Sequence, residues 1–180
     1  MSLWEHSEKK AFEFLFICPE SWVADIESFK PSDCVFKFHL VEDSTDGVEI
    51  SKNKTKIFDF SQINQYKKIL YLDTDIIAVR NFDHILCKDY GNKLYVACNV
   101  KKVSFTSHGG DYHSLRYFSS EKIQELTNAN QRPFNAGQFL FINSDVMKKH
   151  FENLNWLMSV WPGEYFFEQS FMNHYFCGLS

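Results

Sequence analysis

Two aspartates stand two residues apart at the end of an apolar run, in the stretch KKILYLDTDIIAV of residues 67–79. If residues 69–75 are extended, Asp73 and Asp75 point to the same side of the chain. Aspartate is uncommon in strands, and an unpaired buried carboxylate is costly, so both charges need compensation. Carboxylate oxygens suit Mg²⁺ or Mn²⁺, which typically share their coordination with substrate phosphates. The pair predicts a divalent-cation site; the alternative is two aspartates that only shape a turn or cap a helix.

The segments that must position this pair alternate between strand and helix patterns. Apolar or alternating runs predict strands at 11–17, 34–41, 67–79, 93–100 and 134–144. Helical spacing and end signals predict helices at 19–30, 51–66, 121–130, 145–161 and 164–176. This order favours an α/β fold with a mostly parallel central sheet flanked by helices, in a single domain over 1–180. The strand at 67–79 is the most apolar and is expected to be the most central, with the aspartates near its carboxyl end, where such sheets bind ligands.

Composition excludes several classes of protein. The 180 residues are 44% hydrophobic and 17% aromatic, which is typical of a packed globular chain. The net charge of −4 argues against nucleic-acid binding. Five scattered cysteines, odd in number and without a C-x-x-C pair, do not predict a disulfide framework, and they suit a reduced compartment. The sequence shows no membrane-length apolar run and no signal-peptide pattern, so we expect a cytoplasmic protein without a transmembrane segment.

Four blocks of the sequence resemble the glycogenin-like retaining glycosyltransferases of family 8, which have the GT-A fold. YKKILYLDTDIIAVRNFDHIL is similar to the D-x-D signature of that family, and NKTKIFDFSQINQY to the threonine-lysine helix that precedes it. FNAGQFLFINSDVM is similar to the family's Asn-[Ser/Ala]-Gly strand, and EYFFEQSFMNHYF to its acidic-Gln helix. The blocks occur in family order, between residues 11 and 176. Relative to the family, we expect the chain to be truncated at both ends.

The resemblance implies a nucleotide-sugar donor, usually a UDP-sugar, and a divalent metal, Mn²⁺ or Mg²⁺, that bridges the D-x-D motif and the diphosphate. By position, Asp73 would lie near the ribose and the metal, and Asp75 would be a direct metal ligand. A cation at this place would stabilise the charge that develops on the leaving diphosphate. The acceptor would be a hydroxyl of a glycan, a protein or a lipid.

The resemblance assigns further residues to the donor. Lys56 matches the basic residue that approaches the donor phosphates; the alternative is a solvated lysine. Asn99 falls where many members carry an acidic sugar-binding residue. Three residues would contact the donor sugar, with the small ones allowing close approach of the backbone: Asn135, Ala136 and Gly137. An ordinary turn before a buried strand is the alternative for these three.

Glu168 and Gln169 match the acidic-Gln pair that holds the sugar hydroxyls and faces the reacting carbon. The family usually has aspartate at the first of these positions, so Glu168 is a departure, one methylene longer. An exposed polar stripe on a helix packed by aromatic residues is the alternative. With retention of configuration, the reaction is either a same-face substitution or a double displacement through Glu168 or Gln169.

Two other functions fit the same sequence. One is a sugar-nucleotide-binding module or fragment without turnover, which the truncation favours. The other is a different D-x-D glycosyltransferase family, galactosyl or mannosyl, which a preference for GDP would favour. A D-x-D phosphatase or nuclease would leave the Asn-Ala-Gly and Glu-Gln blocks unexplained.

Overall fold

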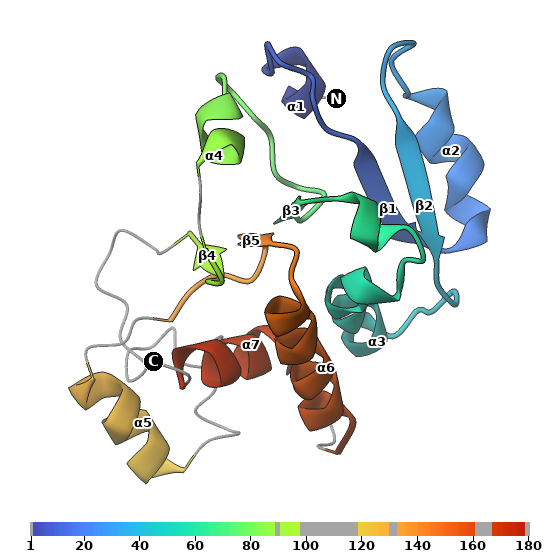
Figure 1. The fold of residues 1–180 in the computed structure, drawn as a ribbon. Coiled ribbons are helices and arrows are strands. Elements are labelled where there is room, and N and C mark those ends of the chain that lie inside the picture. The colour runs from blue at the N-terminus through green and yellow to red at the C-terminus, as the bar shows by residue number, and fades with distance from the viewer. Residues whose placement is uncertain (1, 89–90, 98–118, 130–132, 161–166, 179–180) are drawn as a thin grey trace.

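The computed structural model describes residues 2–88, 91–97, 119–129, 133–160 and 167–178 (Figure 1). The strands are β1 (Phe14–Cys18), β2 (Phe36–Leu40), β3 (Lys68–Leu72), β4 (Tyr95–Val96) and β5 (Gln138–Ile142). The α-helices are α1 (Ser2–Glu5), α2 (Val23–Ser28), α3 (Gly47–Lys52), α4 (Asp83–Cys87), α5 (Ser120–Asn128), α6 (Asp145–Val160) and α7 (Phe167–Cys177). Three 3-10 helices complete the order: η1 (Glu20–Trp22), η2 (Asn53–Asp59) and η3 (Ile63–Gln65). The α/β class is confirmed.

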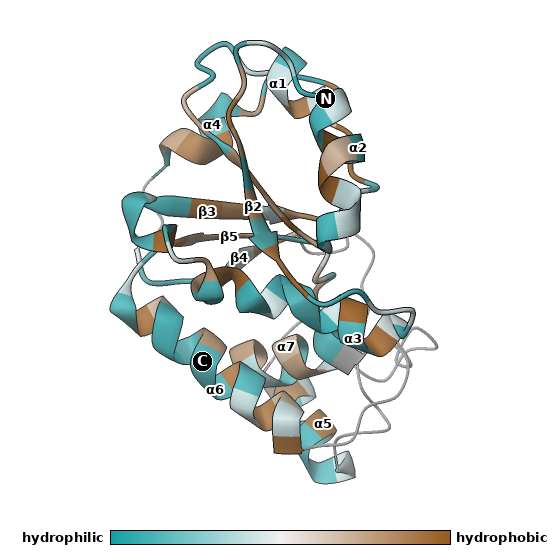
Figure 2. Cartoon of the chain, turned by 90° about the vertical axis from the view of Figure 1, so that its right-hand side faces the viewer, coloured by the Kyte–Doolittle hydropathy of each residue, from teal (hydrophilic) through white to brown (hydrophobic). Residues whose placement is uncertain are grey.

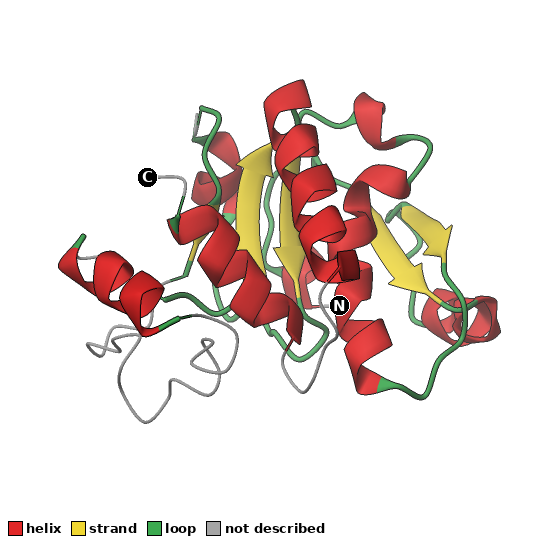
Figure 3. Ribbon diagram, turned by 90° about the horizontal axis from the view of Figure 1, so that it is seen from below, coloured by secondary structure: helices red, strands yellow, loops and turns green. Residues whose placement is uncertain are grey.

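The described strands form two sheets that lie side by side (Figure 3). β1 and β2 are parallel and joined by α2, as the sequence predicts, with Phe16 opposite Phe38. β5 lies between β3 and β4 and is antiparallel to both, with Leu70 opposite Leu140. The expected parallel pairing therefore holds for the first sheet only.

The strand at 67–79 is not the central one. β3 is an edge of its sheet, and its five residues are all half-buried, whereas β5 is in the middle and its three inner residues are buried. Ile69 and Tyr71, which lie on the same face of β3, pack against the main core. The apolar side chains of the strand thus reflect the core that this face contacts, which does not by itself require a neighbouring strand on both edges.

The main core lies between β5 and the two C-terminal helices. Phe139, Phe141 and Phe151 are buried with ring centroids 5.2–6.2 Å apart. The buried stripe of α6, at Met147, Phe151, Leu154 and Met158, has the spacing of one helix face. α6 and α7 consequently cover the same side of the three-stranded sheet (Figure 2). A smaller aromatic cluster covers the other sheet, around Trp4, Cys34 and Phe36.

The segment at 51–66 is not one helix. α3 begins earlier, at Gly47, where the Asp46 side chain accepts a hydrogen bond from the Val48 amide at 2.8 Å. After Lys52 the chain continues as 3-10 turns, and the Thr55 hydroxyl donates to the Lys52 carbonyl at 2.7 Å. Such local side-chain bonds compete with a regular α-helix.

Among the described residues, none of the helices is both long enough and apolar enough to span a membrane.

Candidate active site

The two aspartates of the D-x-D motif lie on a turn and not on an extended strand. β3 ends at Leu72, and the Ile76 amide donates to the Asp73 carbonyl at 3.2 Å, which closes a turn over the motif. The Asp73 amide donates to the Gly137 carbonyl at 2.7 Å, so this turn is fixed to the residue before β5. Asp73 is half-buried as a result, and Asp75 is exposed at the tip. The expectation of an extended chain through both aspartates is wrong.

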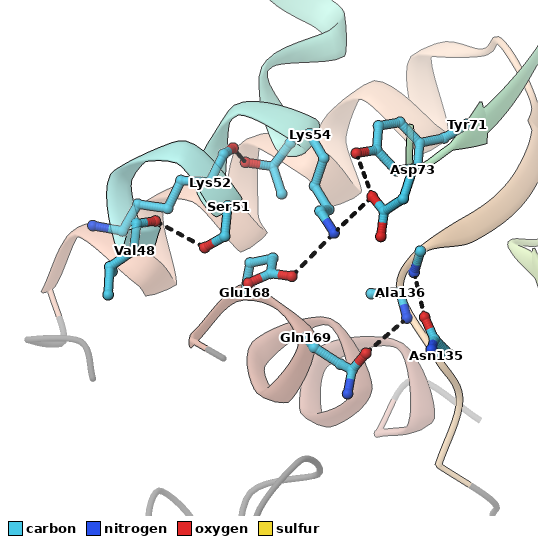
Figure 4. A network of polar contacts seen from close by, with 12 residues as sticks. Val48, Ser51, Lys52, Lys54, Tyr71, Asp73, Asn135, Ala136, Glu168 and Gln169 are labelled. Carbon is cyan, nitrogen blue, oxygen red and sulfur yellow. Dashed lines mark hydrogen bonds and ion pairs between the residues drawn. The ribbon is translucent and has the colours of Figure 1, made fainter. Parts of the chain in front are cut away.

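The Asp73 carboxylate receives two donors from the protein. The Tyr71 hydroxyl donates to Asp73 Oδ1 at 2.8 Å, and Lys54 Nζ lies 3.3 Å from the same oxygen (Figure 4). Burial raises the pKa of the Tyr71 hydroxyl, and the neighbouring Asp73 charge raises it further, so the phenol stays protonated and donates. The Tyr71 ring stacks on Phe139, with centroids 4.6 Å apart, which fixes its direction.

Lys54 connects the D-x-D turn to the first turn of α7. Its ammonium pairs with Glu168 Oε1 at 3.1 Å as well as with Asp73. The side chains of Lys54 and Glu168 are only 9% and 8% exposed, whereas that of Asp73 is 38% exposed. A buried ammonium between two carboxylates is compensated, which explains how these charges are tolerated near the core.

The resemblance assigns the basic residue near the donor phosphates to Lys56, and this assignment stays a prediction, whereas the structure brings Lys54 to the carboxylates. Lys56 is half-buried and forms no ion pair within the described part of the chain. In a 3-10 helix, positions two apart are rotated by about 240°, so the two lysines face different directions. A signal for Lys54 is present in the sequence: buried Ile57, Phe60 and Ile63 recur every three residues, and the same spacing places residue 54 on the buried side.

The entry to β5 closes around Asp73 because it carries small residues. Ala136 is fully buried, and the Asn135 side chain accepts a hydrogen bond from the Gly137 amide at 2.6 Å. A Cβ atom on Gly137 would lie 2.6 Å from Asp73 Oδ2 and 2.9 Å from Asn135 Oδ1. Only glycine therefore leaves space for both side chains. Asn135 itself is exposed and accessible to a ligand.

α7 holds this entry in place through buried amide side chains. Gln169 Oε1 accepts from the Ala136 amide at 3.1 Å. Asn173, fully buried, accepts from the Phe134 amide at 2.7 Å and donates to the Phe134 carbonyl at 2.8 Å. The alternative of an exposed polar stripe is wrong, because Glu168, Gln169 and Asn173 are all buried. Sequence reasoning placed Asn173 in the block but did not predict this anchoring role.

One atom of the site has no partner inside the described structure. Glu168 Oε2 is buried, and no described donor lies within hydrogen-bonding distance. Buried carboxylate oxygens are normally paired, so a further hydrogen-bond donor is expected at this atom.

The predicted site residues that the structure describes fall into two groups. Asp73, Asn135–Gly137, Glu168 and Gln169 come together with Lys54 and Tyr71, and Asp75 adjoins them on the turn. Lys56 stands apart, and Asn99 lies outside the described residues.

The residues present fit a hard divalent cation in their chemistry. The described residues include no cluster of three or more His, Cys, Asp or Glu arranged for a metal. Two aspartates with carboxylate oxygens, Asp73 half-buried and Asp75 exposed on one turn, suit Mg²⁺ or Mn²⁺, because these ions take much of their coordination from water and substrate phosphates.

The chain has an α/β fold with a D-x-D turn after β3, small residues before β5, and an acidic-Gln pair at the start of α7. This combination is typical of the GT-A class of glycosyltransferases. The sequence matches the model of glycosyl transferase family 8 over residues 1–177, and the chain belongs to this family.

The chain is also similar to curated plant proteins. Galactinol synthase 1 of Arabidopsis thaliana is 32% identical over 133 residues, which cover 71% of this chain and 36% of that protein. Galactinol synthase 4 of the same plant is 29% identical over 163 residues, 86% of this chain and 44% of that protein. Galactinol synthase 1 of Ajuga reptans is 30% identical over 137 residues, 71% and 37% of the two chains. The chain thus spans less than half the length of these relatives.

Proposed function

We propose that this chain carries the donor site of a glycosyltransferase that moves a sugar from a nucleotide-sugar, a UDP-sugar, to an acceptor hydroxyl with retention of configuration. Membership of family 8 supports the reaction class. The observation that carries the proposal is the cluster of Asp73, Lys54 and Glu168, in which Asp73 packs closely against Gly137.

In this proposal Asp73 and Asp75 hold Mn²⁺ or Mg²⁺. A cation held there would stabilise negative charge on the leaving nucleoside diphosphate. Tyr71 fixes the direction of the Asp73 carboxylate, and the turn closed by Ile76 presents Asp75 to solvent.

The neighbouring residues would bind the sugar and the phosphates. Glu168 Oε2, buried without a described partner, accepts a hydrogen bond from a sugar hydroxyl. Asn135 contacts the same sugar from the exposed side of the entry to β5. We assign the contact with the donor phosphates to Lys54 instead of Lys56. Among the described lysines, only Lys54 forms an ion pair with a carboxylate of the D-x-D motif.

The retaining step is proposed as a same-face substitution. A nucleophile in a double displacement needs a free oxygen aimed at the reacting carbon. Gln169 Oε1 already accepts the Ala136 amide, and Glu168 Oε1 is paired with Lys54, which leaves Glu168 Oε2 as the one oxygen of the two side chains without a described partner. That oxygen is buried and is assigned here to a sugar hydroxyl, so both side chains have positioning roles in this proposal. A sugar-nucleotide-binding module without turnover is the second candidate, since these contacts give both side chains binding roles and no catalytic one.

Calorimetric titration of UDP and GDP, each with and without Mn²⁺, tests the proposed function. UDP binding that requires Mn²⁺ is expected, and Asp75→Ala should weaken it more than about tenfold, which corresponds to 1.4 kcal/mol. Asp25→Ala, an exposed aspartate on α2, is the matched control and should bind as the wild type does. Manganese-dependent binding retained by Asp75→Ala would remove Asp75 from the site.

Assays with UDP-sugars separate the two candidates. Release of UDP from a UDP-sugar, by hydrolysis or by transfer, supports the glycosyltransferase. Tight metal-dependent UDP binding without any release favours the binding module. A preference for GDP over UDP would instead favour another D-x-D family.

A further inference from the structure

The positive charge beside Asp73 is already supplied by the protein. Lys54 Nζ lies 3.3 Å from Asp73 Oδ1 and 3.1 Å from Glu168 Oε1. We propose that Lys54 is an internal cation that competes with the divalent metal for Asp73, and that Glu168 retains Lys54 when the metal takes Asp73. This inference rests on the proposed function, because it concerns the same metal site.

The contacts of Asp73 explain why the two cations would compete. Oδ1 accepts from both Tyr71 and Lys54, and Oδ2 faces the Cα of Gly137 at a distance that excludes even a Cβ atom. A second cation at this carboxylate would stand near the Lys54 ammonium in a partly desolvated place. Like charges at such range repel strongly where water does not screen them. Metal binding at Asp73 is therefore linked to the position and charge of Lys54.

Glu168 is the better anchor for Lys54, and Asp73 the exchangeable partner. The Glu168 side chain is 8% exposed and that of Asp73 is 38% exposed. Burial leaves the pair of Lys54 and Glu168 less screened than the pair of Lys54 and Asp73. The Glu168 contact is also the shorter of the two. Lys54 would thus stay paired with Glu168 of α7 when the metal binds Asp73, and Tyr71 would still orient Asp73.

The inference predicts opposite effects for the two partners of the ion-pair chain. Lys54→Met removes the competing charge and should tighten Mn²⁺ binding in the absence of any nucleotide. Glu168→Gln removes the anchor, leaves Lys54 with Asp73 as its one charged partner in the cluster, and should weaken Mn²⁺ binding. A merely structural role for these residues would weaken binding in both variants.

Electron paramagnetic resonance of free Mn²⁺ measures this binding directly, with protein alone and at constant ionic strength. Lys54→Met is expected to lower the Kd for Mn²⁺ about tenfold, or 1.4 kcal/mol, and Glu168→Gln to raise it severalfold. Lys52→Met is the matched control, because Lys52 pairs with Glu49 on α3, and its Kd should equal that of the wild type. Lys54→Gln, which removes the charge but keeps a donor, decides the sign if Lys54→Met does not fold.

The outcomes separate this inference from the proposed function. Equal Mn²⁺ affinity in wild type and both Lys54 variants, or weaker binding in the Lys54 variants, overturns the competition while leaving the metal site in place. Absence of Mn²⁺ binding in every protein, with and without UDP, overturns the competition and the proposed function together. Tighter binding in Lys54→Met together with weaker binding in Glu168→Gln supports the inference.

Discussion

At the scale of single residues, the space at Gly137 sets the shape of the site. A Cβ atom there would lie 2.6 Å from Asp73 Oδ2, so Gly137→Ala must displace Asp73 or the entry to β5. We expect this variant to weaken manganese-dependent UDP binding at least about tenfold, 1.4 kcal/mol, in the same calorimetric titration. Gly47→Ala is the control, because a Cβ on Gly47 meets nothing within 4 Å. Similar UDP affinity in the two variants would show that the close approach at Gly137 does not matter.

The directions of the side chains in the candidate site could not be predicted from the sequence. The D-x-D, Asn-Ala-Gly and Glu-Gln residues, which the resemblance assigns to one donor site, lie together in the structure, with Asp75 on the adjoining turn, and their roles toward a donor stay predictions. The choice between Lys54 and Lys56 depends on whether the segment winds as an α-helix or a 3-10 helix, because the two differ in rotation per residue. The side-chain bond from Thr55 to the Lys52 carbonyl lies within the 3-10 turns, and a composition-based reading does not detect it.

At the scale of elements, α7 substitutes for a neighbouring strand at the entry to β5. Asn173 satisfies both backbone groups of Phe134 and also donates to the Gln169 carbonyl at 2.9 Å. Asn173→Ala leaves these buried groups unpaired, and we expect the free energy of unfolding in urea to fall by about 3 kcal/mol. Asn153→Ala on α6 loses one half-buried bond to the Tyr175 hydroxyl and should cost about 1 kcal/mol or less. Equal costs in the two variants would contradict the anchoring role.

The elements themselves were predicted better than their buried faces. Each described helix and strand falls within or next to a predicted segment, apart from the short helices α1 and α4. The polar residues of α7 resemble a solvent-facing stripe, and their burial follows from backbone groups at 134–136 that are distant in the sequence. A pattern within one helix does not reveal such partners.

At the scale of the whole molecule, strand pairing was the least predictable feature. α2 makes a parallel crossover between β1 and β2, and this short connection was readable. β3 and β5 are separated by the residues from 73 to 137, so their antiparallel pairing depends on contacts that no local pattern encodes. The two sheets have no described strand pairing between them, and Leu15 of β1 and Ile69 of β3 pack on the same core.

Hydrogen bonds join residues 7–9 to α4, which follows the D-x-D turn, and we expect low pH to weaken them. Asp83 on α4 accepts hydrogen bonds from the Ser7 hydroxyl at 2.5 Å and from the amides of Glu8 and Lys9 at 3.0 and 3.2 Å. These bonds, that of Ser7 foremost, hold the pKa of Asp83 below its usual value.

Because the folded-state pKa lies below the unfolded value of about 3.9, the stabilisation is fully present above that pH and is lost as pH falls through the folded pKa. Asp83→Asn should therefore lower the midpoint of urea unfolding at pH 7, and its deficit against wild type should shrink below about pH 4. A deficit of Asp83→Asn that stays constant from pH 7 to acid would mean that the Asp83 charge does not fasten these segments.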